Sequence, residues 1–246
     1  MFHSAADAHA EARSRKDGQA LPRLARGQLH EVHADARDWA SALAFGLAAI
    51  EADDRRPVML LRTSPRGGML VPCGEGIAGL GIDPARLVIV DARDGTGLLR
   101  AGLDAARSSG PAAVLLESWG ALREYDMVAS RRFVLAAERS RIPVVMLRGD
   151  AEPRASAAHT RWTVVSAPSI PLEARAPGPP ALLVELVKRR GGPAGMRWQL
   201  EWNDEDGALR EIPLETGQAD DVAAPLPGIV VPLPAVRTGA PLRRIA

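Results

Sequence analysis

The sequence predicts an α/β fold with a mostly parallel sheet that helices cover on both faces. Short, continuous apolar runs recur along the first two thirds of the chain and alternate with helix-like segments. Continuous apolar runs are typical of strands buried on both faces, and the alternation with helices is typical of a parallel sheet. After residue 161, strand-like segments follow one another without helices, which indicates an antiparallel extension of that sheet.

The first expected strand covers residues 29–34, and the helix after it covers residues 39–50 and is apolar on nearly all sides. Asp35 and Asp38 precede this helix, and either could cap it. Four more buried strands and two more helices follow, with the strands at Val58–Leu61, Leu87–Asp91, Ala112–Glu117 and Ile142–Leu147 and the helices over Gly97–Ser109 and Asp126–Arg141.

The last three expected strands cover residues 161–167, 181–190 and 196–202. The glycine-rich segment Gly191–Gly195 predicts an antiparallel hairpin between the last two, at one edge of the sheet. We therefore expect a poorly ordered or partner-binding N-terminal arm over 1–26, a core over 27–218 and a flexible, proline-rich tail over 219–246.

Composition narrows the class of protein. The 246 residues include 31 Lys plus Arg and 30 Asp plus Glu, which gives a formal net charge of +1 and argues against a globally basic nucleic-acid binder. One cysteine excludes an internal disulfide framework. There is neither an apolar run of about 18 residues nor a signal-peptide pattern, so a cytoplasmic protein without membrane contact is expected.

The junction between the first strand and its helix is where a phosphate-binding loop would lie. That loop needs Gly, four residues, Gly, Lys and then Ser or Thr, because backbone N–H groups, a Lys and a hydroxyl hold the phosphates and Mg²⁺. Here Ala34 and Trp39 stand at the glycine positions and Ala40 stands at the Lys position, whereas Ser41 matches. We expect no ATP hydrolysis at this loop, whether the turn never bound nucleotide or belongs to an ATPase core that lost its site.

Several segments between about Gly27 and Trp202 together carry a family resemblance. They are Leu29-His-Glu-Val32, Gly79–Pro84, Arg86–Val90, Ala129–Glu138, Ser156–Trp162, Leu186–Gly192, Trp198 and Glu201-Trp202. In this order and spacing the chain resembles the ImuA family of bacterial damage-inducible mutagenesis proteins. The resemblance implies a RecA-like core.

The resemblance also allows the ATPase positions to be compared. RecA-type ATPases have a metal-positioning Asp at the end of an inner strand, where this chain has Glu117. The strand expected to deliver a catalytic carboxylate matches residues 58–64 but ends in Arg62, Thr63 and Ser64. The implied protein is a non-enzyme without a cofactor, and Glu117 is expected to be hydrogen-bonded rather than to bind a metal.

For function, the resemblance implies a role in SOS-induced translesion DNA synthesis and mutagenesis. Family members act with an ImuB-type, Y-family-like protein and an error-prone C-family polymerase, and RecA is a further candidate partner. Three alternatives stay open: a SulA-like inhibitor of the division-ring tubulin homologue, a modulator of the RecA filament, and an unconventional nucleotidase that uses Ser41 and Glu117.

Charge is unevenly distributed along the chain. Residues 131–161 hold seven arginines and three acids, whereas residues 201–221 hold eight acids and one arginine. Arginine pairs well with phosphate and carboxylate, so the basic stretch predicts contact with an acidic partner or with DNA, although a solvated helix face explains it about as well. The candidate contacts are Arg131, Arg132, Arg154, Arg161, Lys188, Arg189 and Arg190. The loop over 149–160 lies where RecA-like recombinases place a DNA-contacting loop.

Three other features predict structure rather than chemistry. His30 and His33 are three apart on a strand, so they point to opposite faces and cannot share a metal ion. Cys73 is expected to be buried or inert. Trp162, Trp198 and Trp202 fall on strands and are expected to pack in the core.

Overall fold

The computed structural model describes residues 22–48, 50, 54–63, 71–173, 176–203 and 208–213. The strands are β1 (Leu29–Ala34), β2 (Val58–Thr63), β3 (Leu87–Ala92), β4 (Ala113–Trp119), β5 (Val144–Gly149), β6 (Thr160–Ala167), β7 (Ala181–Arg189), β8 (Met196–Asn203) and β9 (Ala208–Ile212). The α-helices are α2 (Trp39–Leu47), α3 (Gly74–Gly79), α4 (Gly95–Arg107) and α5 (Met127–Ser140), and 3-10 turns lie at η1 (Ala36–Asp38) and η2 (Pro84–Arg86).

All described strands belong to one sheet, in the order β3-β2-β4-β5-β1-β6-β7-β8-β9. The first six strands of the chain run parallel, and β7, β8 and β9 continue the sheet antiparallel. The predicted mixed sheet is therefore confirmed, and so is the β7–β8 hairpin. The hairpin does not form the edge, because β9 pairs with β8 beyond it.

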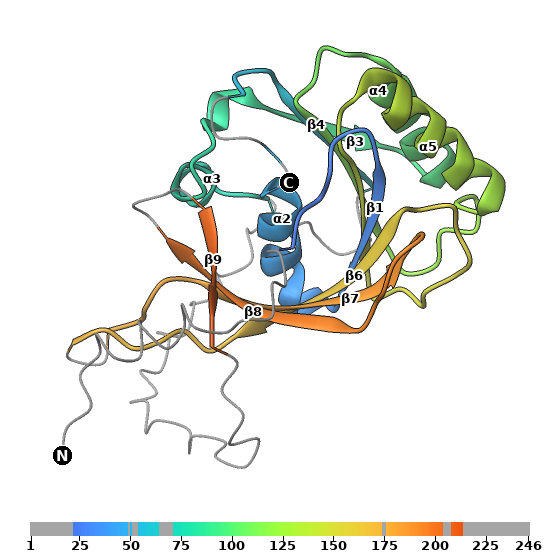
Figure 1. Ribbon diagram of the computed structural model, residues 1–246. Helices are drawn as coiled ribbons and strands as arrows, with labels where there is room; N and C mark the ends of the chain where they lie inside the picture. Colours follow the sequence, from blue (N-terminus) through green and yellow to red (C-terminus); the bar gives the residue numbers. More distant parts are fainter. Residues whose placement is uncertain are drawn as a thin grey trace, which may run out of the picture. The chain divides into compact units, whose positions relative to one another are not determined.

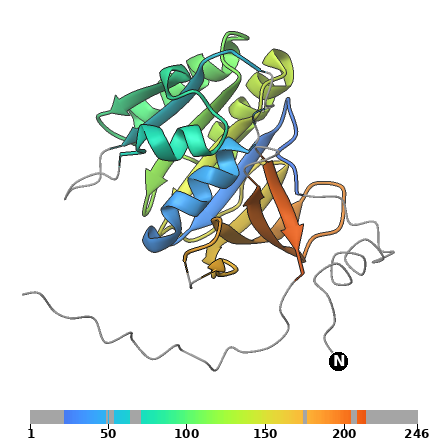
Figure 2. The ribbon, with the colours of Figure 1, turned by 90° about the vertical axis from the view of Figure 1, so that its left-hand side faces the viewer.

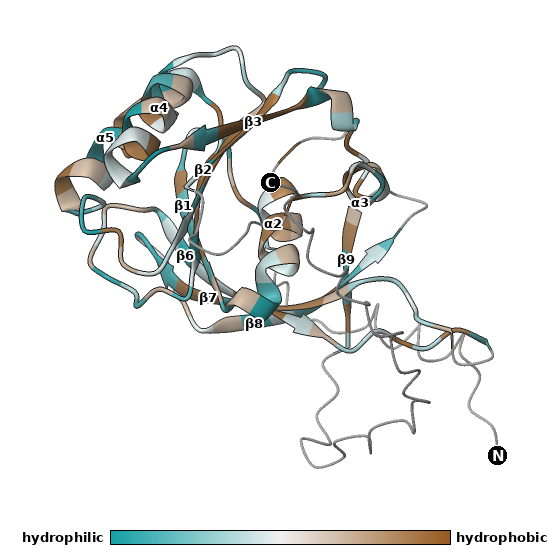
Figure 3. Ribbon diagram, turned by 180° about the vertical axis from the view of Figure 1, so that it is seen from behind, coloured by the Kyte–Doolittle hydropathy of each residue, from teal (hydrophilic) through white to brown (hydrophobic). Residues whose placement is uncertain are grey.

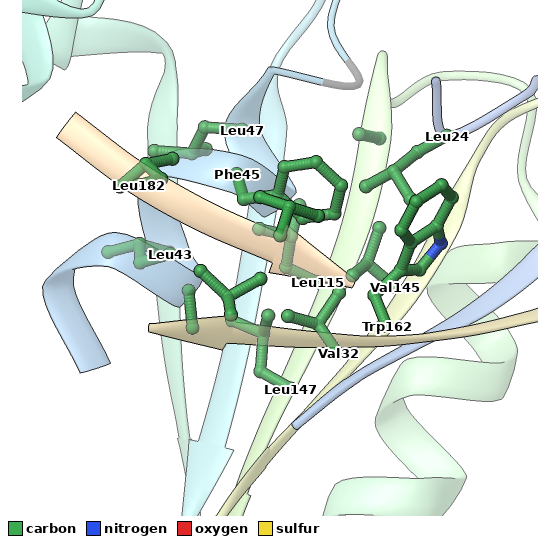
Figure 4. Close-up of a cluster of buried hydrophobic side chains, with 14 of the residues drawn as sticks. Leu24, Val32, Leu43, Phe45, Leu47, Leu115, Val145, Leu147, Trp162 and Leu182 are labelled. Atoms are coloured by element: carbon green, nitrogen blue, oxygen red, sulfur yellow. The ribbon is translucent and has the colours of Figure 1, made fainter. Parts of the chain in front are cut away.

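Helices cover both faces of the parallel part (Figures 1 and 2), with α4 and α5 side by side on one face and α2 on the other. Strand residues alternate between two cores, so Val32 lies in the core under α2 and Leu29 in the core under α4 and α5. In the first core, Phe45 of α2 meets Trp162 of β6 edge to face, with ring centroids 5.4 Å apart (Figure 4).

Most element ends agree with the sequence prediction within a few residues, but some details differ. The first helix ends at Leu47 rather than at residue 50. The short helix α3, the strand β9 and the two 3-10 turns were not predicted. Neither Asp35 nor Asp38 caps α2 with its side chain, whereas Asp94 and Asp126 cap α4 and α5 by accepting from the backbone N–H three residues ahead.

The ends of the chain are described in part. Leu24, within the expected N-terminal arm, is buried in the core under α2. The rest of that arm up to residue 21 and the whole expected tail over 219–246 lie outside the described residues. Among the helices of the described part, none is long and apolar enough to cross a membrane.

Candidate functional site

The position of the phosphate loop lies where β1 ends and α2 begins, at the carboxyl edge of the parallel strands. We call Ala34, Trp39, Glu117 and Trp119 the Trp39 corner. The Trp39 side chain turns inward and is 8% exposed, whereas Ala40 is exposed and provides no charge. These residues line a cavity of about 10 Å³. That is close to the space one water molecule needs, and ligand pockets typically exceed about 300 Å³.

Polar groups around the loop are bonded to one another. The Ala36 N–H, which could face a phosphate, donates to the Asp150 carboxylate at 2.9 Å. Asp38 accepts from the Ser166 N–H at 2.9 Å. The Ser41 hydroxyl, the one matching residue of the motif, shares a hydrogen bond of 2.8 Å with the hydroxyl of Ser166. The Ala36 N–H and the Ser41 hydroxyl, which a nucleotide site would present to phosphate and Mg²⁺, are therefore already bonded to Asp150 and Ser166.

Glu117, at the end of β4, is 2% exposed and accepts from the Trp119 indole N–H at 2.7 Å. Burial raises the pKa of Glu117, and the Trp119 hydrogen bond and the charge of Arg62 oppose this shift. Trp39 Nε1 is close enough to lower that pKa, but it makes no hydrogen bond of ordinary geometry, and Glu117 Oε2 is likewise unpartnered among the described residues. Glu117 is therefore a hydrogen-bonded, poorly compensated buried acid.

The neighbouring strand presents a cation where the resemblance implied a catalytic carboxylate. Arg62 of β2 lies in register with Glu117 of β4 and Asp91 of β3. The Arg62 side chain is 4% exposed, and its Nε donates to Asp91 Oδ1 at 2.9 Å. Ser64 lies outside the described residues. Within the described ranges, no group of three or more His, Cys, Asp or Glu side chains is placed to hold a metal ion.

A second buried cluster lies at the same edge on the opposite face. We call Glu31, Tyr125, Arg148 and Arg161 the Glu31 network. Glu31 is 2% exposed and accepts from Arg161 Nε at 2.7 Å and from the Tyr125 hydroxyl at 2.9 Å. The Arg148 guanidinium lies over the Tyr125 ring, 5.8 Å from its centroid, and donates to the Gly120 carbonyl at 3.1 Å. Burial, with the Glu31 charge, raises the pKa of Tyr125, so its hydroxyl remains a donor.

The Glu31 network also holds the loop over residues 150–159, which connects β5 to β6. Arg161 donates to the carbonyl of Arg154 and to the hydroxyl of Ser156. Lys188 of β7 donates to the Ser156 carbonyl at 2.8 Å. Arg161 and Lys188 therefore hold to the sheet the loop that the resemblance relates to DNA contact. Arg161 also pairs with Glu31.

No family model matches the chain. Protein ImuA of Caulobacter vibrioides, from strain NA1000 / CB15N and from strain ATCC 19089 / CIP 103742 / CB 15, is 34% identical over 183 residues, which is 70% of this chain and 72% of that protein. The chain belongs to the ImuA family.

A crystal structure of the RadB recombinase superimposes on the chain with a TM-score of 0.50 and 14% sequence identity, covering 77% of this chain and 92% of that one. At this identity the likeness concerns the fold, which in this ImuA-family chain is the expected RecA-like α/β fold with an antiparallel C-terminal hairpin.

The seven candidate cations of this ImuA-family chain differ in availability. Arg161 is engaged with Glu31, its side chain 13% exposed. Burial lowers the pKa of Lys188, which is half-buried. Arg154, Arg189 and Arg190 are exposed on the loop and at the end of β7, and Arg131 and Arg132 are exposed on α5. The candidates therefore come from separate elements, and two of them, Arg161 and Lys188, are engaged in contacts within the protein.

The two histidines of β1 point to opposite faces, as predicted. His30 is fully buried, with Nδ1 2.7 Å from Thr160 Oγ1 and Nε2 2.9 Å from the Ala25 carbonyl oxygen. Burial lowers the pKa of His30 to about 4. His33 lies beside the Glu31 network, 3.3 Å from the Ala151 carbonyl oxygen. Both side chains make hydrogen bonds within the protein, and their opposite directions do not let them share one metal ion.

Cys73 was expected to be buried or inert; it is not buried, and its being inert stays a prediction. Its thiol is exposed, and Sγ accepts from the Gly76 N–H at the start of α3. The three strand tryptophans, Trp162, Trp198 and Trp202, are buried as predicted.

The sequence did not point to Trp119, Tyr125 and Glu31 of these clusters, nor to Asp150, which accepts from the Ala36 N–H beside the Trp39 corner. Trp119 had a signal, because residues two apart on a strand share a face and Glu117 was already a candidate. The others had none, since their partners lie far away along the chain.

Proposed function

We propose that this ImuA-family chain is a non-catalytic accessory protein of damage-induced translesion DNA synthesis and mutagenesis. It acts in the cytoplasm through protein contacts with an ImuB-type, Y-family-like protein and an error-prone C-family polymerase. DNA contact is secondary to these protein contacts. The RecA-like fold serves as a scaffold in this proposal, and it neither binds nor hydrolyses nucleotide.

The observation that carries the proposal is the Trp39 corner. The cavity that the Trp39 indole lines measures only about 10 Å³, the Lys position holds Ala40, and the nearby carboxylates of Asp35 and Glu117 disfavour a bound phosphate. The Ala36 N–H is already bonded to Asp150. Restoring a nucleotide site would require the removal of an aromatic residue, the addition of a cation and the release of that N–H.

The nucleotide part is tested by thermal unfolding of the full chain with and without Mg-ATP. At about 1 mM ATP, a site with a Kd of about 10 μM would stabilise the fold by about 2.7 kcal/mol and raise the Tm by several degrees. We expect no shift and no phosphate release above a buffer control. A reproducible Tm increase, or steady hydrolysis that Ser41→Ala abolishes, would overturn the proposal in favour of a nucleotidase.

The partner part is tested with purified proteins and in cells. We expect the chain to co-elute with the ImuB-type protein, the C-family polymerase or both in size-exclusion chromatography, and we expect its deletion to abolish damage-induced mutagenesis. If no complex forms and induced mutagenesis survives deletion, the accessory role fails. Cell filamentation on overexpression would favour a SulA-like inhibitor instead.

A further inference from the structure

The outward face of α5 carries large apolar side chains that no other described element covers. The helix begins after the Asp126 cap and buries residues such as Phe133 and Ala137 against the sheet. On its opposite side Val128 is 61% exposed and Leu135 is 53% exposed. Burying such side chains yields roughly 1.5–3 kcal/mol each, so their exposure is a source of binding free energy.

These two residues share one stripe of the helix. They are seven positions apart, which is close to two turns, so they point the same way about 10.5 Å apart along the axis. Arg131 flanks them on one side, and Arg132 and Arg139 flank them on the other. We call these five residues the α5 outer face. In Figure 3 the ribbon of α5 changes repeatedly between hydrophilic and hydrophobic colours.

The charges of this face are uncompensated. Within the described part of the chain, Arg131, Arg132 and Arg139 make no ion pair with an acidic side chain. The adjacent helix α4 differs, because its Arg107 pairs with Asp104 at 3.6 Å and its exposed positions include no large apolar residue. Apolar exposure and unpaired cations therefore coincide on α5 and not on α4.

We propose that the α5 outer face docks an acidic amphipathic segment of a partner protein. Apolar side chains of that segment would cover Val128 and Leu135, and flanking Asp or Glu side chains would pair with Arg131, Arg132 and Arg139. A DNA backbone would meet the arginines but would gain nothing from the two apolar side chains at the centre of the face. The combination therefore fits protein better than nucleic acid. This inference rests on the proposed function, since the segment belongs to one of the accessory system's proteins.

The test uses the full chain and two purified probes, the ImuB-type protein and the C-family polymerase, with affinity measured by titration calorimetry. Two variants alter the face, Leu135→Ser and the double variant Arg132→Glu/Arg139→Glu. A matched double variant, Arg100→Glu/Arg107→Glu, makes the same charge change on α4. We expect each α5 variant to weaken one complex at least about tenfold and the α4 variant to change affinity less than about threefold. All variants should keep the wild-type Tm within a few degrees.

The outcomes separate this inference from the proposed function. If the wild-type chain binds neither protein, the proposed function fails and the docking surface fails with it. If the wild-type chain binds but the α5 variants bind equally well, the docking surface alone is wrong. A single-stranded oligonucleotide is titrated in parallel. The inference is overturned in favour of a DNA contact if two results coincide. Arg132→Glu/Arg139→Glu weakens oligonucleotide binding, and Leu135→Ser leaves the affinity for both protein probes unchanged.

Discussion

The carboxyl edge of the sheet holds two buried glutamates, one on each face, and they differ in the number and kind of their hydrogen-bond partners. Glu31 and Glu117 are each 2% exposed. Glu31 accepts from a guanidinium and a hydroxyl, whereas Glu117 accepts from one indole N–H and leaves an oxygen unpartnered among the described residues. Buried ion pairs need such additional hydrogen bonds to offset their desolvation. One face therefore holds an organised charge cluster, and on the other face aromatic side chains surround the buried acid.

The largest expected effect comes from the Glu31 network. Glu31→Gln removes the negative charge that Arg161 contacts, and it leaves a buried cation beside Arg148 and Lys188. We expect a loss of about 3–5 kcal/mol in the free energy of unfolding, because breaking a buried ion pair leaves an uncompensated charge. Urea unfolding at neutral pH measures this loss.

A double variant distinguishes the ion pair from packing. Glu31→Leu/Arg161→Met replaces the pair with apolar side chains of similar volume. We expect this double variant to be more stable than Glu31→Leu alone and than Arg161→Met alone. Additive losses would mean that the two residues act independently, which would contradict the idea of a network.

The next effect comes from the Trp39 corner. Trp39→Ala removes a buried aromatic side chain, a change that typically costs about 3–5 kcal/mol. We expect a cost within this range, because the ring is buried in the core under α2 and because Trp39 Nε1 also lowers the pKa of Glu117, whose charge would be less stabilised without it. Trp39→Phe, which keeps most of the ring, should change stability by less than about 1 kcal/mol.

The same variant sharpens the account of nucleotide binding. Trp39→Ala opens space but supplies no cation and leaves Asp150 on the Ala36 N–H, so Mg-ATP should still not shift its Tm. A Tm increase with ATP in Trp39→Ala alone would show that the indole is the one obstacle, and that charge and backbone bonding at the loop matter little.

The contrast between the two faces also explains what the sequence could predict. The departure from the phosphate-loop motif is visible locally, because the motif occupies eight consecutive positions and Ala34, Trp39 and Ala40 all differ from it. The Glu31 network has no local signature. Tyr125 and Arg161 lie 94 and 130 positions from Glu31. The pairing of β1 with β6 places Arg161 beside Glu31, and the connection between β4 and α5 brings in Tyr125.

The fold was predictable for a related reason. The strands β2, β4 and β5 begin with continuous apolar runs, because these strands are buried on both faces, and such runs are recognisable without knowledge of their neighbours. The strand β9 is short and mostly exposed, so it carries little hydrophobic pattern. Helix α3 has six residues, three of which are glycine, and gives no helical periodicity. Elements stabilised by tertiary contacts rather than by their own pattern were missed.

The smallest effect, and the one with a definite sign in pH, concerns Glu117. Its pKa in the folded state is raised above the ordinary value of 4.5 by burial. Above that value the unfolded chain releases a proton that the folded chain retains, so this group lowers stability as pH rises toward the folded pKa. Glu117→Gln stays neutral, so it should match the wild type at about pH 4 and be more stable than the wild type at about pH 8. Glu211→Gln, at an exposed position, controls for the loss of one negative charge. Urea unfolding at both pH values measures the difference. If Glu117→Gln is destabilised equally at both, the carboxylate must be better solvated than its single hydrogen bond indicates, and the contrast with Glu31 disappears.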